Sequence, residues 1–194
     1  GQVPRENLVW LDSGLNTMEK PGMPVIYLNH YPQDSSQNNW YDATDRLKKK
    51  NVQMILCGHG HHNEGFNFDG VPAVMGRSNL RAKDSIGGYN IVTFQNDSAI
   101  FEIRKPVVQT QRRWLAVALF NHHYDQDTSH YFRPSYAVNT KFAQVKPLWK
   151  YQDKSDIGAG TAQAGKLVIA TNTSGDIYAL DLKTGKRKWK FTTG

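Results

Sequence analysis

The chain has 194 residues, of which 39% are hydrophobic and 21% are charged, and its formal net charge at pH 7 is +7. This length suits one large domain or two small ones, and the composition is ordinary for a globular protein with a buried core. The longest apolar runs, such as residues 114–120, are far shorter than the roughly 20 residues that cross a bilayer, so no membrane span is expected.

The positive charge lies in the second half of the chain. Residues 1–105 carry 11 basic and 11 acidic side chains, whereas residues 106–194 carry 13 and 6. A basic surface can attract nucleic acid. However, the densest basic stretch, KTGKRKWK, has the pattern of a hairpin turn with solvated lysines, which also protect an edge strand from aggregation. Nucleic acid is therefore not the expected partner.

The first half predicts alternating helices and strands. Leucines recur at helical spacing in RENLVWLDSGLN (residues 5–16), and apolar residues do so in NNWYDATDRLKKKN (residues 38–51). MPVIYLNH (residues 23–30) and VQMILCG (residues 52–58) are short apolar runs that predict buried strands, the second containing the single cysteine, Cys57. Strand, helix and strand in this order predict a crossover that joins two parallel strands of one sheet.

A different pattern follows. FNFDGVPAVMG (residues 66–76), GGYNIVTFQN (residues 87–96) and SAIFEIRK (residues 98–105) are short strands separated by turn residues, and Asn96-Asp97 predicts a hairpin. We therefore expect an α+β fold for residues 1–105, with two helices, a mixed sheet and an antiparallel meander.

Residues 106–146 predict a connector. It contains one strand, RRWLAVALF (residues 112–120), which we expect to pack on the first domain. The connector also holds histidines and aspartates that could bind a metal, although a polar loop is the favoured interpretation. These residues are His122, His123, His130, Asp125 and Asp127.

Residues 147–194 are all-β in character. KLVIATN (residues 166–172), DIYALDL (residues 176–182) and RKWKFTT (residues 187–193) predict strands, and PLWKYQ (residues 147–152) is a fourth candidate. Four short strands with these turns resemble one blade of a β-propeller. Since one blade cannot bury both of its faces, we expect this chain to be part of a longer protein. The exposed edges should pack on the first domain or pair with another molecule.

Histidines gather where the second buried strand ends, in ILCGHGHHN (residues 55–63). His59 and His61 point the same way in an extended segment, and the glycines beside them permit a tight turn. His30 ends the other predicted strand. If the strands are parallel neighbours, all three imidazoles could converge on metal at one sheet edge. The spacing leaves a second interpretation open, a polar loop bonded to backbone. His62 should point elsewhere.

Carboxylates that could complete such a centre are few. A two-metal hydrolase usually has a bridging carboxylate between its ions. Asp34 follows His30 by four residues and Glu64 follows His61 by three, so either could support the ligating histidines. Both are more simply interpreted as loop acids.

The order PVIYLNHYP, VQMILCGHGHHN and DGVPAVMG resembles the C-terminal half of the calcineurin-like metallophosphoesterases over about residues 5–104. The resemblance implies phosphoester hydrolysis by two divalent ions (Zn, Mn or Fe), with His30 and His59 on one ion and His61 on the other. The family's earlier Asp-x-His, Gly-Asp and Gly-Asn-His motifs do not occur in residues 1–105. We therefore identify no catalytic residue, and expect this chain alone to be almost inactive and to bind the ions poorly or not at all.

The stretch GDIYALDLKTGKRKWKFTTG resembles a repeat of the propellers related to quinoprotein dehydrogenases. The resemblance implies that Trp189 is structural and packs between blades; no quinone is inferred. A phosphoesterase fused to such a domain is expected in the periplasm or outside the cell. The alternative is a non-enzymatic binding protein with a vestigial histidine loop, whose basic, aromatic second half contacts a partner or a glycan.

Overall fold

The computed structural model describes residues 2–18, 20, 22–79, 86–107, 110–129, 131–133, 135, 137–157 and 159–193. The fold is α+β and divides into two units, one formed by Gly1–Val3 and Leu11–Arg133, the other by Pro4–Trp10 and Pro134–Gly194. Among the described residues, no helix combines the length and the apolar character that crossing a membrane requires.

The first unit contains two α-helices and two sheets in its described part. Its elements are α1 (Arg5–Asn16, of which the part from Leu11 belongs here), β1 (Val25–Leu28), α2 (Trp40–Leu47), β2 (Val52–Cys57), β3 (Glu64–Phe68), β4 (Val71–Met75), β5 (Tyr89–Gln95), β6 (Ser98–Lys105), β7 (Thr110–Ala118) and a 3₁₀ turn at Tyr124–Gln126.

The mixed sheet has the strand order β1-β2-β4-β3. β1 and β2 are parallel, and α2 connects them, which confirms the predicted crossover. The β3–β4 hairpin belongs to this sheet, with β4 parallel to β2, so its expected place in an antiparallel meander was wrong. β4 is buried almost throughout, and burial on both faces favours the interior of a mixed sheet.

The second sheet, β5-β6-β7, is antiparallel. Its first hairpin turns at Asn96, whose φ of +51° suits a tight turn, and this confirms the predicted hairpin. The predicted strand at residues 112–120 is confirmed as β7, and the compositional change near residue 105 falls at the β6–β7 turn.

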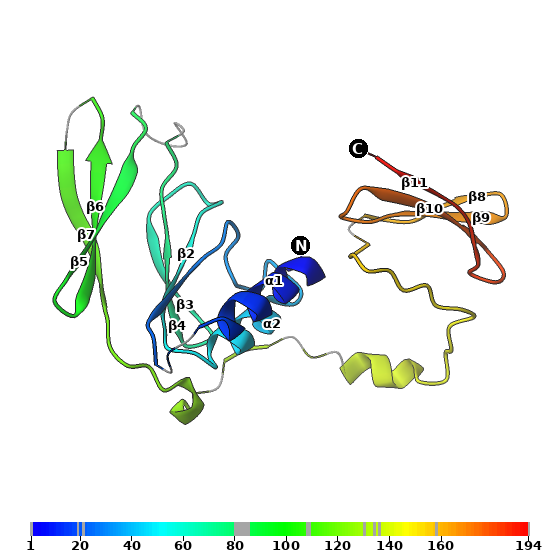
Figure 1. The fold of residues 1–194 in the computed structure, drawn as a ribbon, viewed down its shortest axis with the longest axis horizontal. Helices are drawn as coiled ribbons and strands as arrows, with labels where there is room; N and C mark the ends of the chain where they lie inside the picture. Colours follow the sequence, from blue (N-terminus) through cyan, green and yellow to red (C-terminus); the bar gives the residue numbers. More distant parts are fainter. Residues whose placement is uncertain are drawn as a thin grey trace. The chain divides into compact units, whose positions relative to one another are not determined.

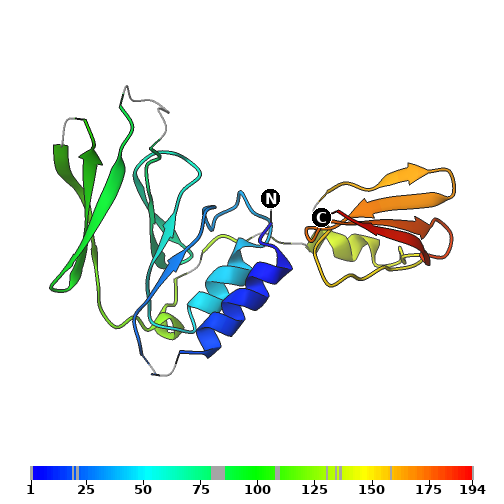
Figure 2. The ribbon, with the colours of Figure 1, turned by 45° about the horizontal axis from the view of Figure 1, so that its top comes forward.

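One apolar core of the first unit lies between the two sheets. Met54 and Val74 of the mixed sheet cluster with Ala99 and Phe101 of the antiparallel sheet, and all four are at most 2% exposed. The helices lie on the other face of the mixed sheet (Figures 1 and 2). An ion pair of 2.9 Å between Asp12 and Arg46 joins α1 to α2. Burial of apolar side chains therefore stabilises β1 and β2 between the helices and the second sheet.

A buried carboxylate anchors the end of this unit. Asp69, in the β3–β4 turn, is 4% exposed and pairs with both Lys48 and Arg133. The Arg133 guanidinium also reaches Asp45 on α2, at 2.7 Å. A buried charge is stable only when paired, so these contacts hold the last residues of the unit against α2.

The second unit contains a 3₁₀ helix at Ala137–Phe142 and an antiparallel sheet of order β11-β10-β9-β8. Its strands are β8 (Ala162–Ala164), β9 (Leu167–Thr171), β10 (Asp176–Asp181) and β11 (Arg187–Thr192). The prediction of a strand at residues 147–152 was wrong, since none forms there. Pro147 has no N–H to donate to a strand partner, and the Trp149 side chain is held by a different contact. The Trp149 indole donates to the Leu182 carbonyl at 2.9 Å and lies against Gly185.

A polar network supports β10 in this unit. The Asn172 amide donates to both Asp153 and Asp176, and the Tyr178 hydroxyl lies within hydrogen-bond distance of both carboxylates and donates its one proton to either of them. Lys190 on β11 pairs with Asp176 at 2.8 Å, and this contact is the main reason that the pKa of Asp176 lies below its ordinary 3.8. The network therefore depends on an ionised Asp176.

We expect acid to unfold the β8–β11 sheet. Because the pKa of Asp176 is lower in the folded chain, its stabilisation is complete above the ordinary pKa and is lost as the pH falls below it. Amide NMR signals of β10 should begin to weaken below about pH 4 and be lost progressively as the pH falls further toward the lower folded pKa. Asp176→Asn should weaken the sheet at pH 7 and flatten this pH dependence. Asp97→Asn, at the β5–β6 turn of the first unit, is the control, and an unchanged acid transition in Asp176→Asn would contradict the assignment.

Candidate functional site

The carboxyl ends of β1 and β2 bring two of the predicted histidines together. Beyond the strands, backbone pairing continues, since the Asn29 N–H donates to Leu56 at 2.9 Å and the Gly58 N–H donates to the His30 carbonyl at 3.0 Å. The rings of His30 and His59 then lie 5.4 Å apart, centroid to centroid, in an edge-to-face arrangement. The parallel register thus places an imidazole at the end of each strand on one side of the loop.

Tyr31 is a third aromatic residue of this group, and sequence reasoning missed it. Its ring centroid lies 4.5 Å from that of His59 and 5.0 Å from that of His30. The only signal in the sequence was its position directly after His30. Packing against both imidazoles lets Tyr31 limit their rotation.

His61 and His62 are both exposed, and they differ in their contacts. The His62 ring contacts the Gly60 carbonyl and the Glu64 carboxylate, each at 2.7 Å. Since both partners accept hydrogen bonds, His62 satisfies them together only with a proton on each ring nitrogen. In that state it cannot ligate a metal. Glu64 is therefore a partner of His62, and no contact places it beside His30 or His59.

The loop backbone is unusual at two histidines. His59 and His61 have φ values of +68° and +59°, in the left-handed region. This conformation costs a residue other than glycine about 1 kcal/mol or more and tends to occur at functional sites. The two imidazoles are thus presented from a backbone that glycine would adopt more easily.

A cavity of about 500 Å³ opens beside His59, and Asp34 and Tyr31 also line it. Asp34 accepts a hydrogen bond from the Ser36 N–H at 2.9 Å, which shapes the loop after β1. Burial, and then the negative charge of Asp34, raises the pKa of the Cys57 thiol to about 11. Asp34 therefore lies within electrostatic range of the end of β2, on the side of the sheet edge where His59 stands.

The site is incomplete as a metal centre. Across the part of the chain that the structure describes, no group of three or more His, Cys, Asp or Glu side chains could hold an ion. His30 and His59 form a pair with Asp34 nearby, and His61 is not among the residues that line the cavity. The same result applies to His122, His123, Asp125 and Asp127; His130 lies outside the described residues.

Comparison with protein-family models gives no match, and comparison with curated proteins gives none.

The Cys57 thiol should be inert in the native chain. With a pKa of about 11, it should resist iodoacetamide at pH 8 and react once urea unfolds the protein. Asp34→Asn removes one of the two causes of the raised Cys57 pKa. In the native variant, Cys57 should therefore be alkylated faster at pH 9 to 10 than in native wild type, as measured by mass spectrometry. Asp97→Asn is the matched control. Equal rates in all three proteins would contradict the proximity of Asp34.

Proposed function

We propose that residues up to Arg133 form part of a metal-dependent phosphoesterase domain, and that His30 and His59 are ligands of its two-metal centre. The single observation that carries this proposal is the meeting of the two imidazoles at the ends of adjacent parallel strands. Ligand sites of open α/β sheets lie at this edge. The resemblance of the strand-end motifs to calcineurin-like metallophosphoesterases supports the same assignment.

The donor chemistry fits in part. Neutral imidazole is a favoured ligand of Zn, Mn and Fe, and the left-handed backbone of His59 and His61 favours a loop built for function. Two divalent ions in such a centre would activate water for attack on a phosphoester. The residues of this chain would hold and orient those ions, and the further acidic donors are not among the described groups. We assign His61 to the other ion, the one that His30 and His59 do not bind, only by resemblance.

We propose that the β8–β11 sheet is a propeller-like blade. Its sequential antiparallel order is the arrangement of such a blade. Trp189 and Phe191 are two residues apart on β11, so their side chains lie on the same face of the sheet. They are 45% and 60% exposed, and this apolar face has no cover in the described part of this unit. A neighbouring blade stacked on this face would bury both rings, and Trp189 would then be structural. Self-association through the β11 edge is the alternative use of this surface.

A second function remains a candidate because no three-donor group forms among the described residues. In this alternative the chain is a non-enzymatic binding protein with a vestigial histidine loop. Metal affinity distinguishes the two functions, since a vestigial loop need not bind an ion.

We expect the chain to bind Mn²⁺ weakly, through His30 and His59. Low Mn²⁺ concentrations should broaden the ring NMR signals of these histidines before those of the others, because the paramagnetic ion acts over short distances. His30→Ala or His59→Ala should weaken binding at least about tenfold, since each removes one of two ligands. His62→Ala is the matched control and should leave binding unchanged.

The chain should not hydrolyse p-nitrophenyl phosphate measurably faster than buffer with the same ion, because no three-donor group forms among the described residues. If Mn²⁺ does not broaden the ring signals of His30 and His59 before those of the other histidines, the ligand assignment is refuted and the binding protein is favoured. Robust metal-dependent hydrolysis would instead show that this chain holds enough of the metal centre to catalyse the reaction.

A further inference from the structure

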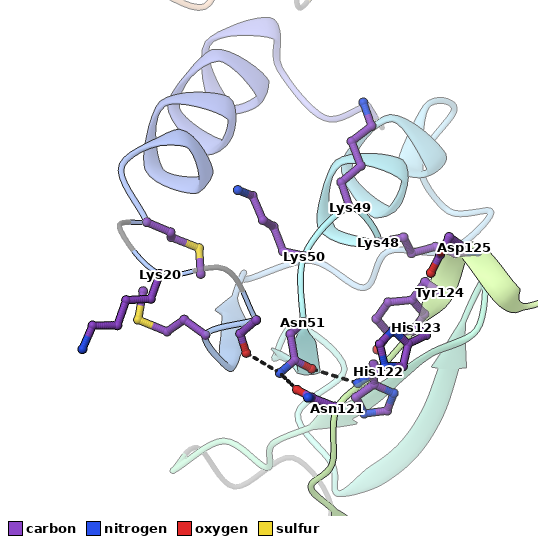
Figure 3. A pocket seen from close by; sticks show the side chains of 13 residues that line it. Lys20, Lys48, Lys49, Lys50, Asn51, Asn121, His122, His123, Tyr124 and Asp125 are labelled. Atoms are coloured by element: carbon purple, nitrogen blue, oxygen red, sulfur yellow. Dashed lines mark hydrogen bonds between the residues drawn. The ribbon is translucent and has the colours of Figure 1, made fainter.

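A second cavity lies at the opposite ends of the same two strands. It has a volume of about 600 Å³, within the range of ligand pockets. Figure 3 shows its walls, which come from the turn after α1, the lysines before β2 and the segment after β7. None of the histidines proposed as metal ligands lines it.

Asn51 holds these walls together. Its side-chain amide donates to the Gly22 carbonyl and to Asn121, each at 2.8 Å, and its oxygen accepts the His122 backbone N–H at 2.9 Å (Figure 3). Three segments far apart in sequence therefore meet at one residue. The cavity is a built feature of the fold rather than a gap between loops.

The lining is strongly cationic. It includes Lys20 and Lys48–Lys50, against one acidic residue, Asp125. Lys48 is paired with Asp69. For Lys49 and Lys50, by contrast, no salt bridge is found within the described residues, and in Figure 3 Lys50 extends from the turn before β2 toward the end of α1. Concentrated positive charge beside a concave surface favours an anion.

A buried polar atom also points to a ligand. The His122 ring lies between Phe120, with centroids 4.0 Å apart, and Tyr124, at 5.1 Å. Its Nε2 atom is buried and has no hydrogen-bond partner among the described residues. Burial lowers the pKa of His122, so the ring is neutral at pH 7 and one nitrogen can donate. An unpaired buried polar atom is costly unless something binds it.

An apolar cavity adjoins the cationic one. It has a volume of about 380 Å³, shares Gly22, Asn51 and Asn121 with its neighbour, and is lined by Ile26, Phe94, Leu119 and Phe120. Phe94 and Phe120 are 56% and 59% exposed, so an apolar ligand in this cavity would cover both rings. A single molecule that reached across the shared residues would meet cations at one end and aromatic rings at the other.

We propose that these adjoining cavities bind one small amphipathic anion, with its phosphate or carboxylate group at Lys49, Lys50 and His122 and its apolar body against Phe94 and Phe120. Carboxylate and phosphate share the chemistry of the cationic end. The apolar end rejects a ligand that is charged throughout. This site is independent of the proposed metal centre.

The test uses the full chain and four probes: decyl phosphate, decanoate, 1-decanol and inorganic phosphate, each below its micelle-forming concentration. We expect decyl phosphate or decanoate to shift the backbone amide signals of Asn51 and His122, and to bind at least about tenfold more tightly than 1-decanol, a ratio that corresponds to about 1.4 kcal/mol. Preference for decyl phosphate would identify a phosphate ligand, and equal binding a general anionic one; both outcomes support the site.

Matched variants separate charge from apolar contact. The double variant Lys49→Gln/Lys50→Gln should bind decyl phosphate about tenfold or more weakly than wild type. The control Lys183→Gln/Lys186→Gln, which makes the same charge change in the second unit, should bind it as wild type does. Phe94→Ser, at the apolar end and away from His122, should weaken the binding of decyl phosphate but leave any shift by inorganic phosphate unchanged. Equal loss in both lysine pairs, equal affinity for 1-decanol, or no shift at Asn51 and His122 would overturn the proposal. An unchanged amide spectrum for each free variant establishes that it folds.

Discussion

The parallel pairing of β1 with β2 is the constraint on which the first unit depends. Parallel neighbours need a crossover, and α2 supplies it while covering the sheet. The same pairing has a consequence at each end. At the carboxyl ends it aligns His30 with His59, and at the amino ends it aligns Gly22 with Asn51. One register therefore positions both of the sites that we propose.

Burial holds that register. A parallel strand pair is stable when both faces are covered, and here the helices cover one face while Met54 and Phe101 meet on the other. A slip of one residue would turn Met54 out of the core. Loops gain order from polar contacts instead: Asn51 joins three segments, and Asp69 gathers Lys48 and Arg133. The core thus sets the strands, and buried polar groups set the loops between them.

The second unit depends on a different balance. Its sheet has little apolar cover in the described residues, and both β8 and β11 are exposed along their whole length. Stability there comes from β10, where Tyr178 is 1% exposed and its hydroxyl contacts two carboxylates. Such a network fixes a single arrangement, because each group left unpaired would be costly. The exposed rings of Trp189 and Phe191 are the part that this network does not stabilise.

Sequence alone determined the local elements and the first convergence of histidines. Helical spacing predicted α1 and α2, apolar runs predicted β1 and β2, and their order predicted the parallel pair that joins His30 to His59, because these patterns are set by neighbours within a few residues. Only the tertiary structure decided the rest. Glu64 bonds to His62, in a loop whose backbone is left-handed at His59 and His61. The fourth strand of the second unit is β8, which pairs with β9, whereas the Trp149 indole donates to the Leu182 carbonyl. The cationic cavity is lined by residues as distant in sequence as Lys50 and His122, and Asn51 bonds to the His122 N–H; no local pattern encodes a contact made by long-range packing.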